Sequence, residues 1–227
     1  MRLDPALQLF LWSVFAALAA GLGPFFIGRK YLGWANAFAA GMMLGAAYLV
    51  MDSGLERAAL IASGGAALGI IATFSIHGWL GIGTRPVLAY LASAVHSSPE
   101  GIAMGAAMAL SPSFGAFVVL TFAIHNISES AVVISSLEAG GQPRGRATLL
   151  AIAARATQVM FALIAYFIAQ SADVALSVTL GFAFGALVYL CVAELLPESY
   201  HTAGRTSIAV VASVAAGVVA LLGGGAR

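Results

Sequence analysis

Apolar stretches long enough to cross a bilayer follow one another along most of the chain. A membrane-spanning helix needs roughly 20 apolar residues, and eight stretches reach that length. They lie at about 6–27, 31–52, 58–80, 87–110, 114–136, 147–169, 174–196 and 206–224. Short polar or helix-breaking strings, such as Ser111-Pro112-Ser113, separate them. The pattern predicts an all-α, polytopic membrane protein with eight transmembrane helices, forming a single transmembrane domain over residues 1–227.

The composition supports this class. Of the 227 residues, 61% are hydrophobic and only 8% are charged, against about 25% charged residues in soluble domains. The net charge of +1 gives no reason to expect a nucleic-acid partner, and the lipid bilayer is the expected surroundings. Cys191 is the only cysteine, which excludes an intrachain disulfide and a multi-cysteine metal site.

The basic residues predict an orientation. The connections after the first, third, fifth and seventh stretches hold six of them: Arg29, Lys30, Arg85, Arg144, Arg146 and Arg205. The opposite side holds only Arg2, Arg57 and Arg227. Because cytoplasmic loops carry the excess of Lys and Arg, we expect those four connections in the cytoplasm and both termini outside. The compact chain, without a targeting extension, is expected in a bacterial inner membrane.

Two short strings inside the fourth and fifth stretches carry the candidate chemistry. The first runs His96-Ser97-Ser98-Pro99-Glu100-Gly101, and the second runs His125-Asn126-Ile127-Ser128-Glu129. Each places a histidine and a carboxylate four residues apart, and such pairs share one face of a helix. Ionisable groups at membrane depth are costly and usually mark a functional site.

Two imidazoles and two carboxylates on neighbouring helices are typical of a metal site. The set His96, Glu100, His125 and Glu129 suits Zn²⁺ and tolerates Fe²⁺, Mn²⁺, Co²⁺ or Cd²⁺. Pro99 removes a backbone hydrogen bond and tends to kink its helix, which would help these side chains to converge. A proton relay uses the same residue types, so it stays open as the second interpretation.

Four further polar residues lie near the two strings. Ser97 and Asn126 directly follow the histidines, where they would orient the ligands, bind weakly, or form helix–helix hydrogen bonds. Arg155 and Gln158 lie near the middle of the sixth stretch. An arginine at that depth must be paired. We expect Arg155 to face the core and neutralise Glu129 or Glu100; the alternative is a side chain that extends toward the cytoplasmic connection.

Other ionisable residues lie near the ends of the stretches. Glu194 is a candidate exit-side ligand at the cytoplasmic end of the seventh stretch. Glu198 and His201 are expected as solvated residues of the following connection, between Pro197 and Arg205. His77 is expected at the interface, beside Trp79.

The motifs resemble those of the ZIP (Zrt-/Irt-like protein) family of divalent-metal transporters, especially its prokaryotic GufA-like branch. That family carries His-Asn-x-Pro-Glu-Gly motifs in helices 4 and 5. Strings typical of the family also occur in the second stretch and at the end of the seventh. They are Phe38-Ala39-Ala40-Gly41-Met42-Met43-Leu44 and Ala193-Glu194-Leu195-Leu196-Pro197-Glu198-Ser199.

The resemblance implies more than the spacing does. It implies eight helices in an inverted 3+2+3 arrangement, both termini outside, and a transport site between helices 4 and 5. It implies movement of metal toward the cytoplasm, and a homodimer.

The chain departs from the binuclear pattern of some members of that family. Where those members complete a second metal position with Asn, Asp and Glu, this sequence has Ser97, Asn126 and Gln158, all neutral. Arg155 would add positive charge there. The resemblance, with these departures, predicts a mononuclear site.

The predicted function is transport of a divalent cation, Zn²⁺ first and also Cd²⁺, Fe²⁺ or Mn²⁺, into the cytoplasm by alternating access. The metal is the substrate, and no organic cofactor is expected. An intramembrane zinc-dependent hydrolase is the rival enzyme class, but no His-Glu-x-x-His string occurs. A metal or proton sensor that does not transport is the third interpretation.

Overall fold

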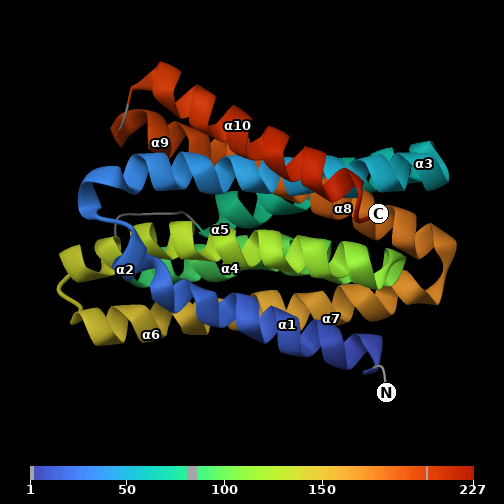
Figure 1. Cartoon of the computed structure of the whole chain (residues 1–227), viewed down its shortest axis with the longest axis horizontal. Helices are drawn as coiled ribbons and strands as arrows, with labels where there is room; N and C mark the ends of the chain where they lie inside the picture. The colour runs from blue at the N-terminus through green and yellow to red at the C-terminus, as the bar shows by residue number, and fades with distance from the viewer. Residues whose placement is uncertain (1–2, 81–85, 203) are drawn as a thin grey trace.

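The computed structural model describes residues 3–80, 86–202 and 204–227. Within these ranges the chain forms helices joined by short connections, and no strand occurs. The helices run roughly along one direction as a bundle (Figure 1). This agrees with the all-α class predicted from the sequence.

The first predicted stretch forms α1 (Pro5–Ala19), a 3₁₀ turn (Ala20–Leu22) and the short α2 (Gly23–Phe26). Asp4 begins it, because its side chain accepts hydrogen bonds from the backbone N–H groups of Ala6 and Leu7. Pro5 follows at the first helical position, where its missing N–H costs nothing.

The next helix folds back on itself. After a 3₁₀ turn (Arg29–Tyr31), α3 runs from Leu32 to Leu80, but Ala58 has non-helical backbone angles. A Cβ placed on Gly54 would lie 3.1 Å from Cβ of Ala62, although eight residues of straight helix span about 12 Å. The two halves of α3 are therefore antiparallel, as the colours of Figure 1 also show. They cover the second and third predicted stretches.

Two helices carry the histidine strings. They are α4 (Pro86–Leu110) and α5 (Pro112–Ala139). Ser111 separates them and caps α5, since its side chain accepts a hydrogen bond from the N–H of Phe114. The helix α4 continues through Pro99.

The sixth predicted stretch is broken in two. It forms α6 (Arg144–Ala154) and α7 (Ala156–Ser171), and Arg155 lies at the break between them. Discontinuous helices are typical of substrate sites in transporters.

The seventh stretch is longer than predicted. It forms α8 (Asp173–Leu190), a π-helical turn (Cys191–Leu195) and α9 (Leu196–Thr202). The prediction that a loop begins at Pro197 is wrong. Proline excludes a hydrogen bond in a regular helix, but the wider π turn just before it absorbs the mismatch, and the helix resumes. The last helix is α10 (Arg205–Gly224).

Six helical segments of the described ranges are long and apolar enough to span a membrane: Pro5–Phe26, Arg29–Gly78, Pro112–Ala139, Arg144–Ser171, Asp173–His201 and Arg205–Gly224. The halves of α3 count here as one segment, and α4 is not among the six. A multi-pass helical protein follows from this. The number of eight spans and the inverted arrangement stay predictions.

Both termini lie at the same end of the bundle, and α2, α6 and α9 lie toward the opposite end (Figure 1). Small residues allow the helices to approach closely. A Cβ on Gly181 of α8 would overlap the carbonyl oxygen of Ala62 in α3, and one on Gly101 of α4 would overlap that of Gln158 in α7.

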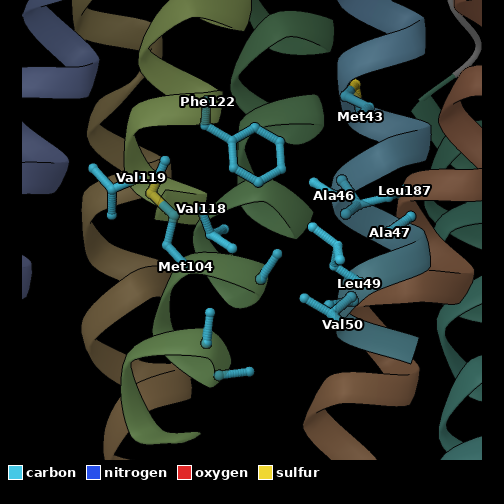
Figure 2. Packing of buried hydrophobic residues seen from close by; sticks show 14 of the residues in the cluster. Met43, Ala46, Ala47, Leu49, Val50, Met104, Val118, Val119, Phe122 and Leu187 are labelled. Atoms are coloured by element: carbon cyan, nitrogen blue, oxygen red, sulfur yellow. The ribbon is translucent and has the colours of Figure 1, made fainter. Parts of the chain in front are cut away.

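An apolar core fills the bundle toward the end where the termini lie. Figure 2 shows side chains from α3, α4, α5 and α8 that meet there, among them Met43, Leu49, Met104, Phe122 and Leu187. Each of them is 1% exposed or less. Phe122 lies against the ring of His125, with 5.8 Å between ring centroids. The core therefore begins directly beside the candidate metal ligands.

Candidate metal centre

Three of the predicted ligands meet in the middle of the bundle. One ligand atom each of Glu100, His125 and Glu129 lies within 4.8 Å of the others, and all three residues are buried. Nε2 of His125 lies 3.2 Å from Oε1 of Glu100 and 2.9 Å from Oε2 of Glu129. Because Glu100 comes from α4 and the other two from α5, packing of these two helices creates the group.

The imidazole of His125 is held in one orientation. Its Nδ1 lies 3.0 Å from the carbonyl oxygen of Ala39 in the first half of α3. A carbonyl only accepts, so Nδ1 is the donor, and the lone pair of a neutral ring lies on Nε2. That lone pair faces two carboxylates, an arrangement that a cation on Nε2 satisfies. Histidine ligands of metals are commonly oriented by such a hydrogen bond from the other ring nitrogen.

Arg155 lies against the same carboxylates. One guanidinium nitrogen lies 3.0 Å from Oε2 of Glu129, and the other lies 3.5 Å from Oε1 of Glu100. The latter nitrogen also donates to the hydroxyl of Ser97 at 2.8 Å. The side chain is 1% exposed, so it faces the core and does not extend toward the connection between α5 and α6.

The two amides near the site are bonded to each other. Asn126 donates to the side-chain oxygen of Gln158 at 3.0 Å and to the carbonyl oxygen of Ala16 at 2.8 Å. Gln158 in turn donates to Oε2 of Glu100 at 3.0 Å. These contacts fix one carboxylate of the group, and Ser97 holds the arginine. Ser97, Asn126, Arg155 and Gln158 thus form one hydrogen-bonded network around the two carboxylates.

His96 lies away from this group, although it is one helical turn from Glu100. Its Nε2 lies 2.5 Å from Oε2 of Glu194, whose other oxygen lies 2.5 Å from Nδ1 of His77. The rings of His77 and His96 also touch edge to face. A second His/carboxylate cluster therefore joins α3, α4 and the π turn after α8.

A cavity of about 470 Å³ connects the two clusters. His77, His96, Glu129 and Glu194 line it, and Glu198 and His201 line it farther along. Exposure increases along this series: Glu129 is buried, the Glu194 side chain is 18% exposed, and Glu198 and His201 are exposed. The cavity therefore leads from the buried group toward α9, at the end of the bundle away from the termini (Figure 1).

The sequence did not predict the contact that one residue of this cavity makes, and it placed two others in the wrong element. His77 contacts Glu194 and lines the cavity, a contact that the sequence did not predict. Glu198 and His201 belong to helix α9 and not to a loop. A usable signal was present: Glu194, Glu198 and His201 follow helical spacing through Pro197, and helical spacing places them along one face.

The chain is similar to a curated plant protein. This relative is a protein of Arabidopsis thaliana named "Putative zinc transporter", which is 28% identical over 229 aligned positions. The match covers 90% of this chain but only 36% of the plant protein, so the chain spans about a third of the length of that relative. No family model matches the chain.

Fold and site together define a multi-pass membrane protein with a buried histidine–carboxylate cluster at the end of an open cavity. The similarity to a plant protein with this name supports the resemblance to the ZIP family of divalent-metal transporters that the motifs predict. The prokaryotic branch of that family stays a prediction.

Proposed function

We propose that the protein carries a divalent metal ion across a membrane into the cytoplasm, with Zn²⁺ as the best-fitting substrate. The observation that carries this proposal is the buried group of Glu100, His125 and Glu129 at the inner end of a cavity lined by further histidines and carboxylates. Imidazole and carboxylate ligands suit Zn²⁺, and also Cd²⁺, Fe²⁺ and Mn²⁺. The plant relative, which is named as a zinc transporter, supports the same substrate class.

The donor set fits a metal ion. Oε1 of Glu100 is buried and lies 3.2 Å from His125 and 3.5 Å from Arg155, but neither contact is a well-formed hydrogen bond, although a buried carboxylate oxygen is usually satisfied. An ion bound to Nε2 of His125 would satisfy that oxygen and one of Glu129. His96 is the fourth ligand in the proposal. It would turn from Glu194 toward the ion when the site fills.

The proposed site holds one ion. Ser97, Asn126 and Gln158 offer no anionic ligand for a second ion, and Arg155 places a positive charge beside both carboxylates. A second divalent ion would therefore meet repulsion without compensation.

The proposed route to the cytoplasm passes from the buried group to Glu194 through His96. His96 is one turn from Glu100 and in contact with Glu194, so it can reach both ends of this step. Glu198 and His201 would receive the ion at the exposed end of the cavity. Because the apolar core lies on the other side of His125, this conformation is the one open toward the cytoplasm in our proposal.

The packing of small residues suggests which helices move. Glycine contacts hold α3 against α8 and α10, and another set holds α4 against α7 and α2 against α5. The three buried ligands all lie in the second set, whereas His77 lies in the first and Glu194 lies in the π turn that follows α8. We infer that alternating access shifts the second set relative to the first.

The proposal includes the remaining expectations from the sequence: a bacterial inner membrane, both termini outside and a homodimer. A hydrolase is disfavoured, because the relative is named as a transporter and not as an enzyme.

Uptake of Zn²⁺ and Cd²⁺ into proteoliposomes tests the function. We expect saturable uptake by the purified wild type and its loss in Glu129→Gln, since the variant removes a ligand charge at nearly constant size. Glu138→Gln is the matched control, because Glu138 is on the same helix but pairs with Arg29 at the surface. Uptake no greater than in empty liposomes with every divalent ion tried would refute the transport function.

A further inference from the structure

Two different groups contact the same pair of carboxylate oxygens. Nε2 of His125 lies 3.2 Å from Oε1 of Glu100 and 2.9 Å from Oε2 of Glu129. The guanidinium of Arg155 lies 3.5 Å and 3.0 Å from those two oxygens. An ion that binds His125 and both carboxylates must therefore share its oxygens with a fixed cation.

This fixed cation cannot leave easily. Arg155 is the largest of the fully buried side chains of the described residues. It lies at the break between α6 and α7, and Ser97 accepts a hydrogen bond from it at 2.8 Å. Arginine remains protonated in proteins, and a guanidinium only donates hydrogen bonds. Its positive charge is thus present at every pH at which the protein is folded.

A fixed positive charge weakens the binding of every divalent cation, but it does not weaken the binding of all of them equally. Mg²⁺ and Ca²⁺ are bound by oxygen ligands, and Ca²⁺ takes 6–8 of them. In this site Arg155 shares one oxygen of each carboxylate, and Gln158 donates to the second oxygen of Glu100. Few oxygens remain for a hard ion, and the repulsion from Arg155 is uncompensated.

For Zn²⁺ and similar ions, a nitrogen ligand contributes to binding in a way that it does not for hard ions. The imidazole of His125 faces the site with its Nε2, and nitrogen ligands favour Zn²⁺ and Co²⁺ over Mg²⁺ and Ca²⁺. The repulsion by Arg155 is therefore offset for these ions by the bond to nitrogen.

We propose that Arg155 is a selectivity-determining residue, a built-in cation that rejects hard divalent ions such as Ca²⁺ and Mg²⁺ from the His125 site while Zn²⁺ still binds. This inference rests on the proposed function, because it concerns the same site. It assigns to Arg155 a role beyond neutralising buried carboxylates.

The test compares metal affinities of the full chain purified in detergent. Binding of Co²⁺ is followed by its visible absorption, and Zn²⁺, Mn²⁺, Ca²⁺ or Mg²⁺ is added as the competitor. The variants are Arg155→Gln, Arg155→Lys and, as the matched control, Arg146→Gln, which removes the same charge from an exposed position of α6. Circular dichroism and size-exclusion chromatography check that each variant is folded.

We expect Arg155→Gln to lower the ratio of Zn²⁺ affinity to Ca²⁺ affinity by at least about tenfold, mainly through tighter Ca²⁺ and Mn²⁺ binding. Arg155→Lys and Arg146→Gln should keep the ratio near that of the wild type, because the lysine preserves the charge and Arg146 lies outside the site. If the role of Arg155 were purely structural, Arg155→Gln would instead lower the affinity for all of these ions by similar factors.

Other results overturn the inference. An unchanged ratio in folded Arg155→Gln refutes it while leaving the proposed function in place. If Arg155→Gln does not fold, the wild type still decides: displacement of Co²⁺ by submillimolar Ca²⁺ or Mg²⁺ refutes the selectivity, and resistance to millimolar amounts supports it. A wild type that binds neither Zn²⁺ nor Co²⁺ refutes the proposed function together with the inference.

Discussion

His96 contacts Glu194 at 2.5 Å, although Glu100, its partner in the sequence motif, is one helical turn away in the same helix. The two residues of the motif thus belong to different clusters, Glu100 to the buried group and His96 to the cavity. One turn of helix rises about 5.4 Å, so we predict that a change of side-chain rotamer brings His96 near the buried group. We therefore expect His96 to act in both places.

His125→Ala and His96→Ala should affect metal binding to different extents. His125 points Nε2 at both carboxylates, and its removal takes away the imidazole ligand of the group, so affinity for Zn²⁺ should fall by at least about 100-fold. His96→Ala should cost only about tenfold, because His96 must first leave Glu194. Isothermal titration of the purified variants with Zn²⁺ measures both.

His201→Ala is the control for these two variants, since His201 lines the exposed end of the cavity. Its Zn²⁺ affinity at the buried site should match that of the wild type. If His125→Ala binds as tightly as the wild type, the ion does not bind at this group.

Glu194→Gln should separate transport from binding. Glu194 contacts His77 and His96 but is not part of the buried group. The variant should therefore keep Zn²⁺ affinity at the buried site within about threefold and lower the maximal uptake rate by about tenfold, since the ion loses its next ligand on the way out. Equilibrium titration and proteoliposome uptake give the two quantities.

Glu198→Gln serves as the comparison, because this carboxylate lines the same cavity at an exposed position. Its effect on the uptake rate should be smaller than that of Glu194→Gln. An unchanged uptake rate in Glu194→Gln would contradict the proposed route.

The fold class and much of the site could be predicted from the sequence, because both depend on local spacing. Apolar runs of membrane-spanning length define the helices, and the spacing of His125 and Glu129 places both on one helical face. The depth of Arg155 in an apolar stretch required an ionic partner, and the carboxylates of the two motifs were the nearest candidates.

Other features depend on contacts between distant segments. The pairing of His96 with Glu194 depends on which helix lies opposite α4, and spacing within α4 cannot specify that. The contact of His77 with Glu194 was missed for the same reason. The helix after Pro197 was missed because proline usually ends a helix, whereas here a π turn precedes it and Leu195 offers its carbonyl oxygen to Asn36 and Ser199.

The close contact of α3 with α8 leads to a prediction about stability, and the neighbouring residue provides its control. A Cβ on Gly65 would overlap the carbonyl oxygen of Val178, whereas one on Gly64 would meet nothing within 4 Å. Gly65→Leu should therefore destabilise the protein by about 2 kcal/mol or more through overpacking, and Gly64→Leu should change stability little. Thermal unfolding in detergent compares the two, and equal unfolding temperatures would contradict this packing.

Cysteine labelling should reveal which end of the bundle is open and which side of the membrane it faces. Ser136 lines the cavity and is exposed, whereas Val118 lies in the apolar core and is fully buried. The only native cysteine, Cys191, is buried, so the wild type provides a low background. A membrane-impermeant thiol reagent should thus modify Ser136→Cys rapidly and Val118→Cys hardly at all.

In inside-out vesicles Ser136→Cys should react, and in right-side-out vesicles it should be protected, because the cavity opens toward the cytoplasm in the proposed orientation. The reverse pattern of protection would invert the orientation and make the open cavity an entrance for the metal from outside.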